Sequence, residues 1–359
     1  MVAAVGSLQI YCVNADEAAV VAVVGGTAVG GEIIPGALGD PLVKNSGQVA
    51  FFAGSYGGPG QGIYLGTPSG VAGVATFGQN APGGGTFGGF GWDGFALNNN
   101  GQVAFGADTE GGPGSGIYVA TTASVSSIAL QGNQVGGVTI AGDLASAPLA
   151  LNSQGQVIFG PDINWAGNGI YLGTPAALST VAAIGGSAPG GGTFSSFSDL
   201  GSFMLSLSDS GKVAVGASTD GGPGSGIYVS TNTGLGSAVL EDGTAPSGGT
   251  FRNLFGPVLL NKAGNVVFTA STSTGAGGSF LSTRSGVQSL VVDPAAGFAV
   301  LYPPTQFNNL GQVAFTGITS SGANGIFLVN GSAIETIATD GETAPGGGTL
   351  VLCHIIILG

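Results

Sequence analysis

Few side chains in this chain are suited to catalysis. The one histidine, His354, follows Cys353 in an apolar segment. Neighbouring residues of a strand point to opposite faces, so these two cannot act as a dyad, and we interpret His354 as a structural residue. The sequence has no HExxH, CxxC or GxSxG motif. We therefore expect a protein that is not an enzyme.

Carboxylates are the other groups that could do chemistry. Two carboxyl groups about 5 to 10 Å apart could serve a hydrolase, and six to eight oxygen ligands could hold calcium. The sequence contains no dense DxDxD array, which favours solvated loop acids. We expect no cofactor, with structural calcium as the alternative. The acids near expected strand ends or in loops are Asp108, Glu110, Asp162, Asp220, Glu241 and Asp242.

Two tryptophans, one glycine-rich segment and one glycosylation sequon could mark binding or modification. Trp92 and Trp165 lie in Gly- and Asn-rich surroundings, where each could contact a glycan by stacking or anchor the packing; we favour the anchor. Residues 111–116 (GGPGSG) superficially resemble a phosphate-binding loop but lack its lysine and following helix. Asn330 begins the chain's one N-glycosylation sequon, a triplet that also arises by chance.

These residues belong to a chain that repeats one phrase six times. LNNNGQVAF, which ends at Phe105, and LNSQGQVIF, which ends at Phe159, are two of the copies. The spacings between their shared glycines are 54, 54, 56, 53 and 47 residues. Such a period predicts an array of one supersecondary unit. The shared glycines are Gly47, Gly101, Gly155, Gly211, Gly264 and Gly311.

One repeat, residues 98–151, shows what the unit encodes. A tight Asn/Gly turn precedes GQVAFGA, and a Gly/Pro-rich connection leads to GIYVAT, then SVSSIAL and a fourth segment that ends at Leu149 and Leu151. These segments read as four short strands. The 73 glycines would each weaken a helix by about 1 kcal/mol relative to alanine. A phrase like APGGGTF and a GIY or GIF element also recur in phase with the repeat.

The predicted fold is all-β. Four-stranded sheets arranged radially form a β-propeller, here with blades of ~54 residues. About 27 expected strands favour seven blades, with six as the second choice, and the termini would complete the closing blade. A stacked or open β-array is the structural alternative. We expect a single domain, 1–359, with a partial N-terminal repeat, 1–43, and repeats 44–96, 97–150, 151–206, 207–259, 260–306 and 307–359.

The two cysteines lie at opposite ends of the repeat array. Cys12 is in the partial first repeat and Cys353 in the last strand expected. They could form a disulfide across the seam of a closed ring. They could equally be two small buried side chains that never meet, or pair between neighbouring subunits. Geometry decides among these alternatives.

Composition excludes several classes of partner. Charged residues make up 6% of the chain, against about 25% in a typical soluble domain, and the net charge is −13. We expect no nucleic acid partner, because no basic patch can form. No apolar run approaches the length of a membrane span, so we expect no membrane insertion. The sequence lacks a visible signal peptide, yet its glycine-rich composition is typical of an extracellular protein, which indicates a processed or partial chain.

The repeated phrase resembles a known bacterial pattern. Asn98, Gly101, Ala104 and Phe105 match NxxGxxAF, as does the copy that ends at Phe315; other copies depart from it at one position or more. In this the chain resembles the tandem NxxGxxAF-repeat, choice-of-anchor type of bacterial surface proteins. The resemblance implies export or surface display, often with a C-terminal sorting segment that is not recognisable here. It carries over no catalytic residue.

Two functions follow as hypotheses. The first is a non-enzymatic extracellular or cell-surface structural or interaction protein, whose partner is itself and which self-assembles through its terminal strands into filaments or a surface layer. The alternative is a lectin-like propeller that binds surface glycans through its rim loops, with Trp92 or Trp165 in contact with the sugar and calcium as a support. A hydrolase is the third and poorest interpretation, because His, Lys and Arg are scarce.

Overall fold

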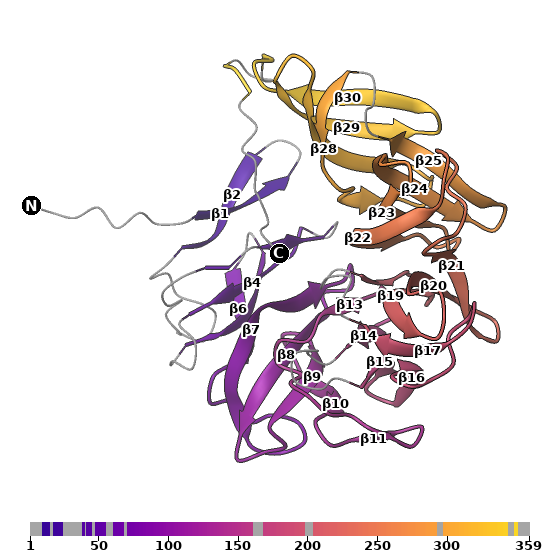
Figure 1. Ribbon diagram of the computed structural model, residues 1–359. Helices are drawn as coiled ribbons and strands as arrows, with labels where there is room; N and C mark the ends of the chain where they lie inside the picture. The colour runs from indigo at the N-terminus through magenta and orange to yellow at the C-terminus, as the bar shows by residue number, and fades with distance from the viewer. Residues whose placement is uncertain are drawn as a thin grey trace, which may run out of the picture. The chain divides into compact units, whose positions relative to one another are not determined.

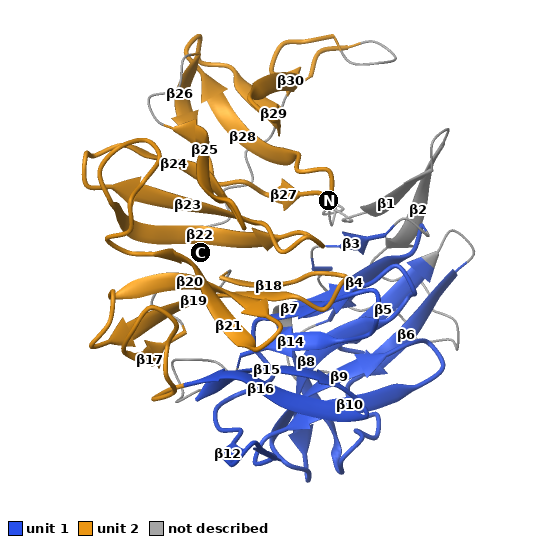
Figure 2. Cartoon of the chain, turned by 90° about the vertical axis from the view of Figure 1, so that its right-hand side faces the viewer, with its two compact units in different colours: residues 1–183 blue, residues 184–359 orange. Residues whose placement is uncertain are grey.

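The computed structural model describes residues 9–14, 17–23, 38–39, 41–44, 47–54, 60–67, 70–160, 168–197, 204–292, 297–343 and 348–350. In these residues the regular secondary structure is all β-strand, and no helix in them has the length and apolarity to cross a bilayer. The chain divides into two compact units, Met1–Ala183 (unit 1) and Ile184–Gly359 (unit 2), which Figure 2 shows in blue and orange.

Unit 1 contains three four-stranded antiparallel sheets (Figure 1). In each sheet, strands that follow one another in sequence are also neighbours. Two short hairpins, β1 (Gln9–Asn14) with β2 (Glu17–Val23) and β11 (Gln134–Val135) with β12 (Val138–Thr139), accompany them. The sheets comprise β3 (Leu42–Val43), β4 (Val49–Ala53), β5 (Gly62–Thr67) and β6 (Gly70–Thr76); β7 (Thr86–Leu97), β8 (Val103–Glu110), β9 (Ser115–Ala120) and β10 (Val125–Leu130); and β13 (Leu149–Leu151), β14 (Val157–Phe159), β15 (Gly169–Thr174) and β16 (Ala177–Ala183).

Unit 2 also contains three sheets (Figure 1). In the first and third, two short strands pair successively with the next strand and take the place of one long first strand. The sheets comprise β17 (Thr193–Ser196), β18 (Leu205–Leu207), β19 (Val213–Asp220), β20 (Ser225–Thr231) and β21 (Gly234–Leu240); β22 (Phe251–Leu260), β23 (Val266–Thr272), β24 (Gly277–Thr283) and β25 (Gly286–Val292); and β26 (Phe298–Leu301), β27 (Gln306–Phe307), β28 (Val313–Thr319), β29 (Asn324–Asn330) and β30 (Ala333–Thr339).

The repeating sheet is the unit from which propellers are built. A propeller blade is a four-stranded sheet. The described chain forms six sheets of this kind in antiparallel order, two of them with the first strand in two short pieces. The predicted fold class, all-β with four-stranded blades of the β-propeller type, is therefore confirmed. The number of blades, the completion of the last blade by the termini and the single domain stay predictions.

The sheets begin one strand earlier than the sequence repeats. The turn 98–101 joins β7 to β8, which are paired antiparallel, so the strand before the repeated phrase belongs to the same sheet as the phrase. The fourth segment predicted for repeat 97–150 exists as β13, but it pairs with β14 of the following repeat. The reason is local: a tight turn can only join adjacent antiparallel strands.

The two recurrent phrases supply an aromatic pair to the core in five of the six described sheets; in the sheet that begins with β17, Val215 takes the place of the first ring opposite Tyr228. Phe105 on β8 lies directly opposite Tyr118 on β9, and their stacked rings are 5.6 Å apart. The same pairing joins Phe268 to Phe280 at 5.5 Å. Cross-strand aromatic pairs are among the more stabilising contacts of a sheet. The remaining stacked pairs are Phe51 with Tyr64, Phe159 with Tyr171, and Phe315 with Phe327.

Each outer strand pair carries a β-bulge close to this aromatic residue. The register shifts between Ile63 and Tyr64 in the first sheet and between Ile227 and Tyr228 in the fourth. A bulge increases the local twist of the strand that carries it. The other four bulges lie at Ser127/Ala129, Ile170/Tyr171, Ser279/Phe280 and Ile326/Phe327.

Candidate ligand-binding hollows

Two surface hollows in the described residues combine polar side chains with enough volume for a small ligand. Hollow A, in unit 1, has a volume of about 400 Å³, and hollow B, in unit 2, about 520 Å³. Ligand sites typically occupy about 300 to 1,000 Å³. Hollow A is lined by Asp108, Gly114, Ser115, Gln131, Gly142 and Asp143, and hollow B by Ser218, Gly224, Ser225, Glu241, Asn253, Leu254 and Phe255.

The two hollows are the same site in two repeats. Five lining positions of hollow B lie 110 residues after five positions of hollow A, the distance that also separates Gly101 from Gly211. The backbone frame is therefore shared while the side chains differ. The equivalent pairs are Asp108 and Ser218, Gly114 and Gly224, Ser115 and Ser225, Gln131 and Glu241, and Asp143 and Asn253.

One loop of identical sequence builds the floor of both hollows. The segment GGPGSGIYV occurs at 111–119 and again at 221–229. Gly114 and Gly224 have φ angles of 98° and 88°, which favour glycine. A β-carbon at Gly114 would also collide with the Gln131 side chain, and one at Gly224 would lie 3.0 Å from Glu241 Oε2. Glycine at this position therefore lets the residue after the fourth strand pack against the loop.

A buried serine connects the segment 142–145, which lines one side of hollow A, to the sheet. The Ser115 side chain lies on β9 opposite Asp108 of β8, and its Oγ accepts a hydrogen bond of 3.0 Å from the backbone N–H of Leu144. Asp143 Oδ1 accepts another, of 2.8 Å, from the N–H of Ala145. These bonds hold both the segment 142–145 and the Asp143 carboxylate in place.

Hollow B presents one oriented carboxylate, an amide and an aromatic ring. Ser225 Oγ donates a hydrogen bond of 2.7 Å to Glu241 Oε2. Asn253 is exposed and Phe255 is 41% exposed, both on β22, while Leu254 between them is buried. Because neighbouring side chains of a strand point to opposite faces, Leu254 anchors the strand and leaves its neighbours free to line the hollow.

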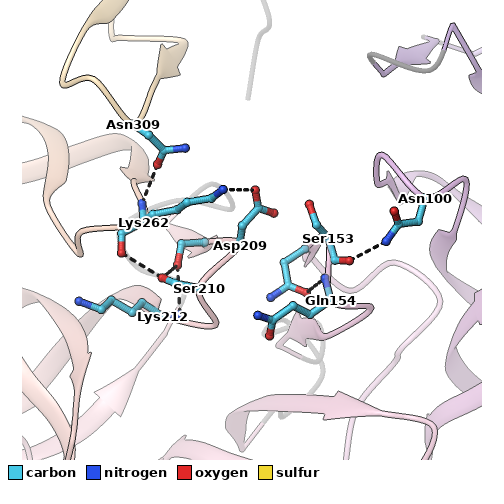
Figure 3. Close-up of polar contacts among 10 residues, drawn as sticks. Asn100, Ser153, Gln154, Asp209, Ser210, Lys212, Lys262 and Asn309 are labelled. Atoms are coloured by element: carbon cyan, nitrogen blue, oxygen red, sulfur yellow. Dashed lines mark hydrogen bonds and ion pairs between the residues drawn. The ribbon is translucent and has the colours of Figure 1, made fainter.

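The repeated NxxG turns form contacts with one another. In unit 2, Ser210 Oγ donates to the carbonyl of Lys262 at 3.0 Å, and Lys212 Nζ donates to the carbonyl of Ala263 at 2.8 Å. Figure 3 shows Lys262 between Asp209, whose Oδ2 is 3.5 Å from Lys262 Nζ, and Asn309, whose Oδ1 accepts from Lys262 N at 2.9 Å. The lysines in these turns therefore link successive repeats.

The same linkage occurs in unit 1. Asn98 Nδ2 donates a hydrogen bond of 2.9 Å to the carbonyl oxygen of Asn152, one repeat later. Asn100 Nδ2 donates one of 2.7 Å to the carbonyl oxygen of Ser153 (Figure 3). The Asn at the start of the phrase is thus both the local turn-former and the connection to the next repeat.

Buried tyrosines do not supply acid–base chemistry near the hollows. Burial raises the pKa of Tyr118 to about 12 and also raises the pKa values of Tyr171 and Tyr228. These phenols therefore stay neutral at neutral pH. Tyr171 donates its hydroxyl proton to Asn168 Oδ1 at 2.7 Å.

The carboxylates expected from sequence are distributed between two hollows and the surface. Asp108 lines hollow A and Glu241 lines hollow B. Asp242 pairs with Arg252 at 2.7 Å on the surface. Glu110 and Asp220 are exposed at the ends of β8 and β19. Among the described residues, no group of three His, Cys, Asp or Glu side chains is placed to hold a metal ion.

Several other candidates lie partly or wholly outside the described residues. The backbones of Cys12 and Trp92 belong to β1 and β7, but their side chains are not described. Cys353, His354, Trp165 and Asp162 lie outside the described residues. The disulfide and the tryptophan–glycan contacts stay predictions.

The glycosylation sequon lies at a surface turn. Asn330 is the exposed last residue of β29, and Gly331, with a φ angle of 62°, turns the chain into β30. Asn330 Nδ2 donates a 3.5 Å hydrogen bond to Glu335 Oε1. The side chain is therefore accessible, and its modification stays a prediction.

Sequence reasoning missed most of the residues that line the hollows. Ser115, Gln131, Asp143, Asn253 and Phe255 belong to no recognisable motif. One signal was available, the identical nine residues at 111–119 and 221–229. Two repeats that share a loop of this length share its backbone, and hence any hollow beneath it.

Comparisons with known proteins place the chain in a family and give no function. No curated protein matches it. Similar solved structures include a puromycin-hydrolysing peptidase of Mycobacterium tuberculosis, with 13% identity and a TM-score of 0.41 over 78% of this chain and 42% of that one. The chain therefore spans less than half of the length of that peptidase. Another is the β-propeller domain of the trilobed protease of Pyrococcus furiosus, with 11% identity and a TM-score of 0.34 over 84% of this chain and 95% of that one. A third is the six-bladed Aleuria aurantia lectin, with 9% identity and a TM-score of 0.33 over 83% of this chain and 93% of that one. A model described as a family of unknown function (DUF7453) matches residues 2–284, and the chain belongs to that family.

Proposed function

We propose that the protein is a non-enzymatic extracellular or cell-surface carbohydrate-binding protein and that hollow B is its sugar site. The supporting observation is the exposed ring of Phe255 beside Asn253 and Glu241 in a hollow of about 520 Å³. An aromatic face packs against the C–H face of a sugar ring, while a few convergent polar groups bind its hydroxyls and fix its orientation. Hollow B offers both kinds of group.

The charge of the site favours a neutral ligand rather than an anionic one. Glu241 gives hollow B one negative charge, and the chain as a whole carries −13. The hydrogen bond from Ser225 orients the Glu241 carboxylate as an acceptor for hydroxyl groups. The low content of charged residues, 6%, supports the extracellular setting.

Replacing Phe255 with alanine is expected to weaken sugar binding at least tenfold, about 1.4 kcal/mol, because the stacking surface is lost. A glycan array identifies the sugar, and titration calorimetry on wild type and variant measures the dissociation constants. Val300→Ala is the matched control, since Val300 is also a half-exposed apolar side chain of unit 2 but lies outside hollow B. Absence of saturable binding to any glycan, or equal affinity in the Phe255→Ala variant, would contradict the proposal.

A second candidate function is self-association through β30. This strand ends its sheet and pairs with β29 alone among the described strands. Its exposed residues include Ile337, at 57%, and Ile334. Glu335 is its one charged residue, and it carries none of the lysines that commonly protect strand edges. We propose that the partner is the same edge of a second copy, which would bury both isoleucines in an isologous contact.

Ile337→Lys is expected to abolish this self-association, because a lysine on an edge strand opposes pairing. Light scattering across a dilution series measures the mass of wild type and variant. Leu310→Lys is the control, since it places the same charge on an exposed apolar residue of the 308–311 turn. A wild-type mass that stays that of one chain at every concentration rules this function out.

A further inference from the structure

We propose that hollow A is a second ligand site, selective for a ligand that carries a protonated amine on a hydroxyl-rich frame. A glucosamine oligomer has this chemistry. The inference rests on the proposed function in one respect: it takes hollow B as the sugar site of the same frame. It goes beyond that function by assigning to hollow A a ligand with a positive charge, on the basis of the side chains that differ between the equivalent positions of the two hollows.

The lining charges distinguish the two hollows. Hollow A has Asp108 and Asp143 where hollow B has Ser218 and Asn253, and Gln131 where hollow B has Glu241. The formal charge of the lining is therefore −2 in hollow A and −1 in hollow B. Two carboxylates in one concave site favour a cation, since each can make a charge-assisted hydrogen bond to an ammonium group.

The hydroxyl group of Ser115 in hollow A can still donate a hydrogen bond, whereas that of the equivalent Ser225 in hollow B already donates one. Ser115 is 3% exposed, and its Oγ accepts from Leu144 N. Its hydroxyl proton has no acceptor among the described residues, whereas the Ser225 proton is donated to Glu241 Oε2. A buried donor without a partner costs free energy that a ligand oxygen can recover. Hollow A thus offers a hydrogen-bond donor beside its carboxylates.

Asp143 is fixed in a position to bind an amine. Its Oδ1 accepts from the backbone N–H of Ala145 at 2.8 Å, which orients the carboxylate and leaves Oδ2 for a ligand. Asp108 lines the same hollow from β8. A carboxylate held this way loses little conformational freedom when it binds.

Hollow A lacks the aromatic ring of hollow B. The position equivalent to Phe255 is Ala145, which is buried. The ligand of hollow A is therefore held by charge and hydrogen bonds rather than by stacking. This predicts binding that weakens as salt concentration rises, unlike binding in hollow B.

The test exchanges the two linings. In a Phe255→Ala background, which silences hollow B, the glucosamine tetramer is titrated calorimetrically at about pH 6, below the pKa of about 8 of a typical amine of this kind. We expect Asp108→Ser with Asp143→Asn to weaken binding at least tenfold. Placing the two carboxylates in hollow B of the same background, by Ser218→Asp with Asn253→Asp, should give that hollow a measurable affinity for the amine, a gain that misfolding cannot produce. Circular dichroism checks that each variant is folded.

The outcomes separate this inference from the proposed function. In the wild-type chain, the N-acetylglucosamine tetramer or the sugar found on the array reports on hollow B. Binding of that neutral sugar, together with glucosamine affinity that none of the hollow A changes alters, overturns the inference and leaves the function standing. Binding of Ca²⁺ but not of the amine in hollow A also overturns it. Amine binding that depends on Asp143, without any neutral-sugar binding, supports hollow A and rejects the function of hollow B.

Discussion

Replacing Phe105 with alanine will lower the free energy of unfolding of unit 1 by about 3 to 5 kcal/mol. The Phe105 side chain is fully buried, and its ring packs against Phe87 and Phe90, each at 5.9 Å, and Tyr118 at 5.6 Å. The three neighbouring rings cannot move far enough to fill the space that the Phe105 ring leaves. The cost is therefore the lost free energy of burying that ring plus the free energy of the cavity. Chemical denaturation followed by tyrosine and tryptophan fluorescence measures the change.

The equivalent change in the other unit supplies a check on where the effect acts. Phe268 is also fully buried and packs against Phe251 and Phe280, each at 5.5 Å. If the two units unfold in separate transitions, Phe105→Ala shifts one and Phe268→Ala the other. Phe255→Ala, at an exposed ring, should change stability by less than about 0.5 kcal/mol. A Phe105→Ala effect as small as that of Phe255→Ala would show that this ring does not anchor the core.

The sequence predicted the elements of this fold because each repeat carries its own local signals. Asn98 and Gly101 specify a turn, and the runs of apolar, β-branched and aromatic residues around Phe105 and Tyr118 indicate two strands. The assignment of strands to sheets was less accessible. β13 lies at the end of repeat 97–150, yet it pairs with β14 of the next repeat. The period of a repeat is the same whichever residue is taken as its start, so it does not show where a sheet begins.

The hollows could not be predicted because they depend on tertiary proximity. Asp108 lies on β8, Gln131 directly follows β10, and Asp143 lies in the connection between β12 and β13. These three side chains line one hollow only in the folded chain. Phe255 shows a second reason. It lies in an apolar strand and would be assigned to the core, but the register of β22 against β23 shifts on either side of it, which places the ring on the surface.

Repetition gives one backbone frame two different sets of lining side chains. The identical segments 111–119 and 221–229 fix the floor of both hollows. The residues that differ, such as Asp143 and Asn253, project from segments whose backbone is held by other contacts, including the bond from Leu144 N to Ser115 Oγ. Side-chain changes at these positions therefore alter charge and shape without a cost to the fold, which is the condition for ligand specificity to diverge.

The second large effect is expected at the start of the repeated phrase. Asn98→Ala should lower stability by about 3 kcal/mol, because Asn98 is buried, at 3% exposure, and all its polar groups are used. Its Oδ1 accepts from Asn100 N and Gln102 N, each at 3.0 Å, and its Nδ2 donates to Gln102 Oε1 at 2.8 Å and to Asn152 O at 2.9 Å. Alanine leaves the Asn152 carbonyl, whose bond to Asn98 is buried, and three part-buried groups without this partner, at about 1 to 3 kcal/mol for each one that water cannot reach.

Asn308 provides a comparison with the same turn at an exposed site. Its Oδ1 accepts from Leu310 N and Gln312 N at 3.0 and 2.9 Å, and its Nδ2 donates to Gln312 Oε1 at 2.8 Å, as in the Asn98 turn. The residue is exposed, so water can replace these bonds, and Asn308→Ala should cost about 1 kcal/mol. Denaturation midpoints of the two variants measure the difference. Equal losses would mean that the turn bonds alone account for the effect of either asparagine. A larger loss at Asn98 means that its burial and its bond to Asn152 of the next repeat add to the stability that the turn supplies.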